Sequence, residues 1–547
     1  MNRILVAVLL AQLSVPTHNE TMEVVVANVD VTVTAKDGTH VSGLLPDDFE
    51  ILDNGVPQRI TNFSEIQESR TITPQLNAAA KPAETTAAQP RKIVFVIDNL
   101  SLHPDARKRV FTSARRFLRA SLGPKDEAMI VTCANGLKLR LPFTSDRDDI
   151  EAALAEIESD VALGSMRIKD IAELREELLS MESAPLAIGV ARQYAMRTRR
   201  EVQHTTDVMK AVLAWMSGIP GKKALVFMTE SLPAEPGIEA FRFIQTKTRS
   251  RAYTNAAEEF YAHDLIESVT AAANAASTTL YPIYARGLSS VGSSLTTRNP
   301  NPVYGAYHGG INERLLKQGM QPTLADAMMI DRDAFETTKG ALDVLAIATG
   351  GFASTGGENF DGVFSDIASD LGSYYSIGYR PTSNAKHKIV VRMKNREWTA
   401  RARDEFVNKS DRDRAIDLVT GALFERTARN DLGISLHFGT KTVDKKKKAH
   451  LPLTIRIPIE KLTLVGNKAS FDIHLRVADQ TGGLSQTADA TREINVPAAE
   501  LSKIRGKYYT FQVDLVAEER KLRVAAAVTD VQAAATSVAV QDVDLRQ

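Results

Sequence analysis

One carboxylate stands out because of where the sequence places it. Asp98 directly follows the apolar run 92–97, which is short, unbroken and rich in β-branched residues, as buried parallel strands are. In doubly wound sheets, ligands bind at the carboxyl ends of such strands. Asp98 is therefore expected at a ligand-binding edge. The alternative is that its side chain accepts hydrogen bonds from backbone N–H groups in the turn before Pro104.

The segments after residue 91 predict the sheet that carries Asp98, because apolar runs alternate with helical patterns. The expected strands are 92–97, 127–132, 137–141, 223–229, 278–284 and 374–379, and the expected helices are 105–121, 147–157, 255–276, 338–349 and 361–371. Strands interleaved with helices favour a mainly parallel sheet covered on both faces. We therefore predict an α/β fold over 91–381, with a doubly wound, Rossmann-like sheet.

Two insertions interrupt this alternation. Residues 158–217 are charged and form helices by composition, and we expect a helical arm that packs over the sheet. Residues 286–325 are rich in Gly, Ser, Asn, Pro and Tyr, which suit an irregular loop. That loop is expected at the same edge of the sheet as Asp98.

The rest of the chain has the alternation of half-buried strands. Residues 21–66 predict a small β unit with a hairpin at Asn54-Gly55, and 67–90 has the composition of a linker. Two alternating stretches within 382–408 are expected to return to this β unit, so the α/β domain is inserted within a β-sandwich. A connecting helix over 409–432 and a β-sandwich over 433–547 complete the prediction.

Composition limits the partners and the chemistry. Lys plus Arg and Asp plus Glu both number 67, which removes the electrostatic case for nucleic acid or an anionic membrane. The single cysteine, Cys133, excludes an intramolecular disulfide and multi-cysteine zinc sites, and we expect it in the core. No nucleophile elbow, His-Glu-x-x-His or phosphate-binding Gly-rich loop is present, so an enzyme is not predicted.

The N-terminal segment predicts export. A charged start and the apolar run 4–10 are typical of a secretory signal, which we place at 1–20. The run is too short to span a bilayer, and no later stretch is long enough. The alternative is a slightly hydrophobic N-terminal strand or tail. We expect a secreted, periplasmic or surface protein.

Seven short motifs, in order, resemble the von Willebrand factor type A family, and the closest likeness is to its acidobacterial branch of exported proteins. They are VSGL at 41–44, DFE at 48–50, FVIDNLS at 95–101, GIPGKKALV at 218–226, YPIYARGL at 281–288, LAIATGG at 345–351 and YYSIGYRP at 374–381. The resemblance covers about residues 24–406. It implies a von Willebrand factor A-like sheet and a non-enzymatic role in protein binding or adhesion.

The resemblance also implies a metal-ion-dependent adhesion site, here in degenerate form. The family holds Mg²⁺ or Mn²⁺ with an Asp-x-Ser-x-Ser loop, a threonine and an acidic residue, and oxygen ligands suit these hard ions. The candidate ligands are Asp98, Ser101, Thr206 and Glu230. Leu100 and Leu102 occupy the two serine positions, and Ser101 lies one residue out of register. A cation is therefore a possible cofactor and not a required one.

The same edge is the expected partner-binding rim, formed by Asn99, Leu100, Leu102 and Ser231 beside the candidate ligands. Two alternatives remain: the leucines pack against the inserted segments, and Glu230 forms an ion pair with a basic residue of the rim. Three function classes follow. The chain is an exported protein that binds a protein or surface polymer, a metal-independent scaffold joining two β-sandwiches, or an undetected hydrolase.

Overall fold

The computed structural model describes residues 5–7, 26–67, 70–72, 85–87, 90–134, 136–165, 173–174, 177–178, 184–248, 255–286, 324–357, 359–381, 386–426, 428–445, 448–518 and 520–546. The chain divides into two compact units. The larger contains residues 26–211 and 221–407, and the smaller contains 1–25, 212–220 and 408–547.

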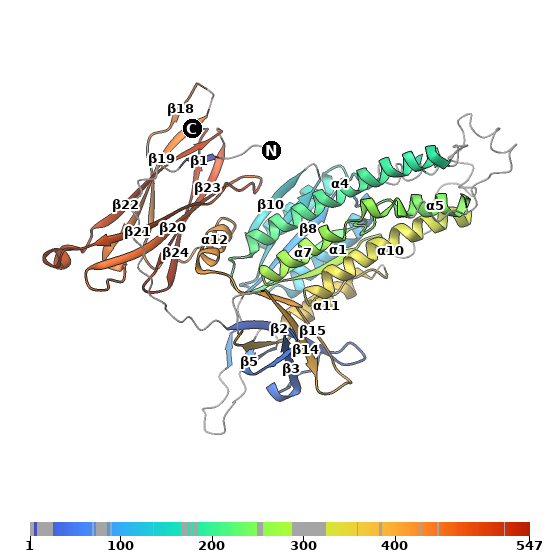
Figure 1. Cartoon of the computed structure of the whole chain (residues 1–547), viewed down its shortest axis with the longest axis horizontal. Helices are drawn as coiled ribbons and strands as arrows, with labels where there is room; N and C mark the ends of the chain where they lie inside the picture. Colours follow the sequence, from blue (N-terminus) through green and yellow to red (C-terminus); the bar gives the residue numbers. More distant parts are fainter. Residues whose placement is uncertain are drawn as a thin grey trace. The chain divides into compact units, whose positions relative to one another are not determined.

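The larger unit is built on a five-stranded sheet with the order β10-β9-β8-β11-β12 (Figure 1). The strands are β8 (Arg91–Asp98), β9 (Glu127–Cys133), β10 (Leu137–Thr144), β11 (Lys222–Thr229) and β12 (Thr278–Tyr284). All neighbouring pairs are parallel except β9 with β10, which is an antiparallel edge pair. Every residue of β8 and β11 is buried, as strands covered on both faces require. The predicted mainly parallel sheet is confirmed.

Helices cover both faces of this sheet. On one face, α1 (Pro104–Ser121), α2 (Arg147–Ser159) and α11 (Phe360–Gly372) share an apolar core with alternate residues of β8, β9 and β11. On β12, α7 (His263–Ala275) and α10 (Leu324–Ala348) also make contact. Pro at its first position, where no N–H is needed, starts α1 directly after the loop that follows β8.

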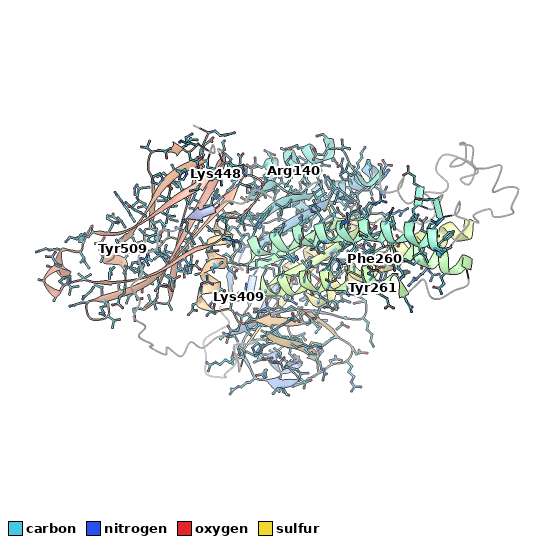
Figure 2. All side chains as sticks on the ribbon, turned by 45° about the horizontal axis from the view of Figure 1, so that its top comes forward. Arg140, Phe260, Tyr261, Lys409, Lys448 and Tyr509 are labelled. Carbon is cyan, nitrogen blue, oxygen red and sulfur yellow. The ribbon has the colours of Figure 1, made fainter. Side chains whose placement is uncertain are left out.

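The helical arm behaves differently from the prediction. Its long helix, α4 (Ala184–Met216), shares an apolar cluster with α5 (Ile238–Thr248), α10 and the short η2 (Glu258–Phe260). That cluster contains no strand residue, and α4, α5 and α10 run alongside one another beyond the sheet (Figure 1). Phe260 and Tyr261, labelled in Figure 2, pack there. The N-terminal half of α4 therefore forms a helical bundle instead of covering the sheet.

A β-sandwich precedes and follows the α/β portion in sequence. One sheet has the order β15-β2-β13-β5-β6-β7, and the other has the order β16-β14-β3-β4. The strands are β2 (Ala27–Thr34), β3 (Phe49–Asp53), β4 (Val56–Gln58), β5 (Ile60–Gln67), β6 (Arg70–Ile72), β7 (Thr85–Ala87), β13 (Tyr374–Tyr379), β14 (Lys386–Met393), β15 (Thr399–Ala402) and β16 (Glu405–Val407). The pairing of β14 with β3 and of β15 with β2 confirms the predicted return of the chain. The hairpin at Asn54-Gly55 is present, with positive φ at both residues, as a type I′ turn requires.

One expected strand belongs to a different sheet. We assigned 374–379 to the α/β series, but β13 lies between β2 and β5, antiparallel to both. Its inward side chains explain this placement, because Tyr375 packs against Phe49 and Phe63 in the sandwich core. The residue types of 374–379 predicted a strand correctly. The aromatic partners of Tyr375 determine which sheet that strand joins.

The smaller unit contains two antiparallel sheets around one core. Their orders are β1-β22-β19-β17, with β18 paired to β19, and β21-β20-β23-β24. The strands are β1 (Leu5–Ala7), β17 (Ser435–Phe438), β18 (Thr442–Val443), β19 (Ala449–Pro458), β20 (Lys468–Asp479), β21 (Ala488–Asn495), β22 (Tyr508–Ala517), β23 (Lys521–Asp530) and β24 (Ala535–Asp544). Helix α12 (Asp411–Ala422) is joined to residues 212–220 by Lys409, labelled in Figure 2, which bonds both Ser217 and Asp417.

The N-terminal segment is described only at β1, which pairs antiparallel with β22. This is the arrangement of the alternative interpretation, an N-terminal strand. The rest of the expected signal at 1–20 lies outside the described residues, so export stays a prediction. Among the helices that the structure describes, none is long and apolar enough to cross a bilayer.

Candidate functional site

The side chain of Asp98 sits at the carboxyl end of β8, inside a closed hydrogen-bond network. Its Oδ2 accepts from the hydroxyls of Ser101 at 2.6 Å and Thr229 at 2.7 Å. Its Oδ1 accepts from the backbone N–H of Leu100 at 3.1 Å. Asp98 is 1% exposed, and Thr229 is fully buried at the end of the adjacent strand β11. The carboxylate is thus satisfied by the protein itself, as the turn-acceptor alternative predicts.

The turn after β8 brings Ser101 to the position that its register excluded. The backbone N–H groups of Ser101 and Leu102 both donate to the carbonyl of Asp98, which folds the chain back within four residues. The Ser101 hydroxyl then lies 2.9 Å from the Thr229 hydroxyl and accepts from the backbone N–H of Glu230 at 2.9 Å. Ser101 therefore connects the β8 loop to the β11 loop. The turn thus brings the candidate residue Ser101 to the Asp98 carboxylate, and a role for it in holding a metal stays a prediction.

Glu230 extends the same network. Its Oε1 accepts from the backbone N–H of His103 at 2.7 Å, across the loop from Asp98. Burial raises the pKa of Glu230 to about 7, and the Asp98 carboxylate adds to the rise, while the His103 N–H, Arg286 and Arg109 oppose it. The two carboxyl groups therefore lie at one edge of the sheet, as predicted. Glu230 changes charge in the neutral pH range.

The segment after α2 covers the β8 loop. The backbone N–H of Leu163 donates to the carbonyl of Asn99, and a Cβ at Gly164 would lie 2.3 Å from the carbonyl oxygen of Ser101. Arg107 of α1 holds this segment by donating to the carbonyls of Glu158 and Asp160. From β10, Arg140, labelled in Figure 2, bonds Glu156 at 2.9 Å and also Asp160. The cover is therefore anchored from two elements.

This cover corrects part of the predicted rim. Asn99 is 2% exposed and Leu102 is fully buried, so neither offers a surface to a partner. Leu102 instead joins the core beneath α1, as the packing alternative for the leucines predicts. Leu100 and Ser231 are half-buried and remain candidates for contact. Of the predicted loop 286–325, only the two ends are described, because residues 287–323 lie outside the described residues.

Thr206 is the threonine that the resemblance assigned to the site, but its neighbour Thr205 is the one that contacts the sheet. Thr206 is fully buried and its hydroxyl donates to the carbonyl of Gln203 in its own helix. The hydroxyl of Thr205 instead lies 3.8 Å from Sγ of Cys133, which is the β9 residue opposite Asp98. Burial raises the pKa of the Cys133 thiol, and the nearby Asp98 carboxylate adds to this. Cys133 is a core residue, as expected.

A small cavity adjoins the network. It has a volume of about 40 Å³ and is lined by Ser101, Glu230, Ser231, Tyr284 and Arg286, among others. A space of that size accommodates about one water molecule. Burial raises the pKa of Tyr284 to about 12, so its hydroxyl keeps its proton at neutral pH. The described part of the rim therefore contains a small polar depression beside Glu230.

These residues do not fit the cation site of the family pattern. Leu100 and Leu102 supply no oxygen, and the Thr206 hydroxyl is directed to its own helix. Both oxygens of Asp98 already accept hydrogen bonds from the protein, which a cation would have to displace. Within the described ranges, no group of three or more His, Cys, Asp or Glu side chains is arranged to hold a metal ion.

Comparisons with known proteins do not assign a family. No family model and no curated protein matches the chain. Among solved structures, a von Willebrand factor type A protein from Catenulispora acidiphila is 8% identical, with 91% of this chain and 72% of that one covered and a TM-score of 0.19. The human COPII-coat protein Sec24c is 11% identical, with 84% and 44% covered and a TM-score of 0.22. A Bacteroides uniformis β-glucuronidase is 11% identical with a TM-score of 0.15, and the match spans 33% of this chain and a fifth, 20%, of the enzyme. Similarities at these TM-scores assign no function to the chain.

Proposed function

We propose that this chain is an exported, non-enzymatic protein of the von Willebrand factor A type that binds a protein or surface polymer through the rim at Asp98. The observation that carries the proposal is the convergence of two strand ends. Asp98 and Ser101 from the β8 loop meet Thr229 and Glu230 from the β11 loop. These are the neighbouring parallel strands at whose carboxyl ends α/β proteins bind ligands.

The order of the strands supports the proposal. In chain order, the sheet reads third, second, first, fourth, fifth, with the third strand antiparallel at the edge. The connection between the first and fourth strands is the crossover where the winding direction changes. Asp98 and Thr229 stand on the two sides of that point.

We further propose that the rim acts without a bound cation. In this arrangement, hydroxyl groups donate to the Asp98 carboxylate, and the raised pKa of Glu230 leaves that side chain only partly ionised at about pH 7. The half-buried Leu100 beside it gives an apolar contact point. Such a rim suits a partner surface that has both polar and apolar groups. It does not require an acidic side chain of the partner to bind a cation.

The second candidate function is a scaffold whose partner surface lies on the C-terminal β-sandwich. A specific observation favours testing it, because that unit exposes large apolar side chains. Tyr508 is 48% exposed, Val465 is 60% exposed and Val443 is 50% exposed. Exposed apolar side chains are candidate contact points for a partner, and Val443 and Tyr508 lie at opposite ends of β19.

Site-specific photo-crosslinking in the producing cells separates the two functions. A benzoylphenylalanine is placed at Leu100, at Tyr508 or, as an exposed control, at Ile347, which is 72% exposed on α10. The rim proposal expects one adduct of defined mass from Leu100 and none from the other two. An adduct from Tyr508 alone favours the scaffold. Equal labelling at all three positions contradicts both.

Export is tested independently of the partner. Residues 1–25 are fused to alkaline phosphatase, which is active only after export. We expect activity outside the cytoplasm, and a fusion lacking residues 4–10 serves as the control. An inactive fusion that accumulates in the cytoplasm would contradict the export part of the proposal and leave the rim part standing.

A further inference from the structure

A second site lies at the other end of the parallel strands, where they begin. A cavity of about 500 Å³ opens where β11 and β12 begin, which is the far end of these strands from Thr229 and the Asp98 rim. Lys222 and Thr278, the first residues of the two strands, line it together with Thr279 and Ser277. The volume lies in the range of small-molecule sites.

The N-terminal β-sandwich supplies the other wall. Asp30 of β2, Ser376 of β13 and Ser64 of β5 are directly opposite one another in register, so they form one polar row across three strands. Asn28 and Tyr374 flank that row and also line the cavity. The apolar residues that alternate with the row point into the sandwich core. The outer face of this sheet is therefore polar where it borders the cavity.

The charges in the cavity are unequal. Of the described residues that line it, Lys222 and Arg403 are cationic and Asp30 is anionic. Asp30 accepts from Nζ of Lys222 at 2.8 Å, and that side chain of Lys222 is 7% exposed. The carboxylate is thus engaged by one cation. The cavity keeps a net positive charge that its own described lining does not balance.

Arg403 is the second cation, and its partners are neutral. Nη1 donates to Oγ of Ser277 at 2.6 Å, Nη2 donates to the carbonyl of Asn28, and the buried Nε has no hydrogen-bond partner among the described residues. The guanidinium also lies 5.5 Å from the ring of Phe406. A planar fork with an unsatisfied N–H suits a carboxylate or phosphate group.

Arg401, two residues earlier, shows what the same side chain does when its anion is present. Its Nη1 and Nη2 each donate to one oxygen of Asp370 at 2.8 Å, a bidentate ion pair. Hydrogen bonds to that carboxylate raise the pKa of Arg401 against the effect of burial, whereas burial lowers the pKa of Arg403 because Asp30 compensates it only in part. The two arginines differ in whether the chain provides their counter-ion.

We propose that the cavity binds a small polar ligand carrying one oxyanion group, a carboxylate or a phosphate, on the guanidinium of Arg403. Nη1 and Nη2 of Arg403 already donate to Ser277 and Asn28, so the group binds on the Nε side of the guanidinium, whereas Asp370 binds Nη1 and Nη2 of Arg401. The hydroxyl-bearing residues Ser376 and Thr279 and the ammonium of Lys222 bind the rest of the ligand. This site is independent of the proposed rim.

The test is calorimetric titration and thermal unfolding of the full chain with three probes: inorganic phosphate, glycolate and glycerol 3-phosphate. We expect saturable binding of at least one probe and a rise in Tm with its concentration. The Arg403→Gln variant is expected to weaken that binding about tenfold or more, since a charged hydrogen-bond pair is lost. Which probe binds shows whether the group is a carboxylate or a phosphate.

Two variants make the result decisive. Arg401→Gln removes the matched arginine outside the cavity and should leave probe binding unchanged. Ser376→Leu fills the cavity while Arg403 stays in place and should abolish binding, with folding checked by circular dichroism. Absence of binding by all three probes, or binding of unchanged affinity in Arg403→Gln or Ser376→Leu, overturns the proposal. If Arg403→Gln does not fold, the Ser376→Leu result decides alone.

Discussion

The two edges of the parallel sheet treat their charged groups in opposite ways. At the carboxyl edge, Asp98 is enclosed by Ser101, Thr229 and the Leu100 N–H, so its charge is satisfied inside the fold. At the amino edge, Arg403 donates to neutral oxygens beside a cavity of about 500 Å³. Where the sequence predicts a ligand, the protein itself supplies the partners of the charged group. At the other end of the strands, where the sequence shows no motif, the charged group borders a cavity. A strand-end carboxylate therefore marks a location, and its surroundings decide whether anything further binds.

The largest expected effect is at Asp98. The Asp98→Ala variant removes the acceptor shared by two buried hydroxyls and one N–H, and should lower the free energy of unfolding by about 3 kcal/mol. Urea denaturation at pH 7 measures it. Asp98→Asn keeps an acceptor in place and should cost less than half as much. Equal losses in the two variants would show that the network contributes little.

The second prediction compares the two arginines. Arg401→Gln leaves Asp370, whose side chain is 8% exposed, without its cation, and should cost about 2 to 3 kcal/mol. Arg403→Gln loses hydrogen bonds to neutral groups, and should cost about 1 kcal/mol. Urea denaturation of both variants in anion-poor buffer gives the difference. A greater loss at Arg403 would mean that the chain itself supplies its counter-ion.

The third prediction concerns pH. Glu230 has a folded pKa of about 7 against an ordinary value of 4.5, so the folded state holds a proton that the unfolded state has released between these pH values. Its contribution to stability is therefore present below about pH 4.5 and is lost as the pH rises to about 7. Glu230→Gln avoids this loss and, at pH 8 with EDTA, should be more stable than the wild type by about 2 kcal/mol, allowing for solvent at the half-buried side chain.

Urea denaturation at pH 5 and pH 8 measures this effect of Glu230. The control is Glu127→Gln at the other end of the sheet, where no such gain is expected. If the wild type and the Glu230→Gln variant lose the same stability between pH 5 and pH 8, the raised pKa is wrongly assigned to Glu230.

The smallest expected effect is that of divalent cations. Calorimetric titration with Mg²⁺ and Mn²⁺ should give no heat that differs between the wild type and Asp98→Asn, because the Asp98 oxygens are already engaged. EDTA should leave the Tm unchanged within about 1 °C. A saturable heat present in the wild type and absent from Asp98→Asn would restore the cation to the rim.

The sequence predicted the location of the rim better than its contacts. The apolar run before Asp98 and the alternation of strands and helices determine the sheet, since burial on both faces dictates that composition. Ser101 was a candidate from the sequence, but its contacts could not be predicted, because a turn of four residues and not strand register sets the direction of its hydroxyl. Thr205 and Thr206 cannot be told apart by spacing, because neighbouring helical residues differ by only about 100° around the axis.

Other features required tertiary information. The strand over 374–379 was visible from its residues, but its neighbours β2 and β5 come from the first 67 residues of the chain. The cavity at Arg403 has no motif at all, because residues near 30, 222, 277, 376 and 403 are brought together only by the fold. A signal for it existed only in hindsight, as two arginines in Arg401-Ala402-Arg403 with one buried carboxylate, Asp370, paired to the first.

The position of β13 between β2 and β5 has a consequence for how the chain acquires its structure. β2 and β5 are not hydrogen-bonded to each other. Each is bonded to β13, which lies about 300 residues later in the sequence. During synthesis, β2 therefore has no strand partner until β13 and β15 are made, whereas β5 can pair with β6, which follows it directly. Pairing between strands so far apart in the sequence is slow, so this sheet is completed late in folding.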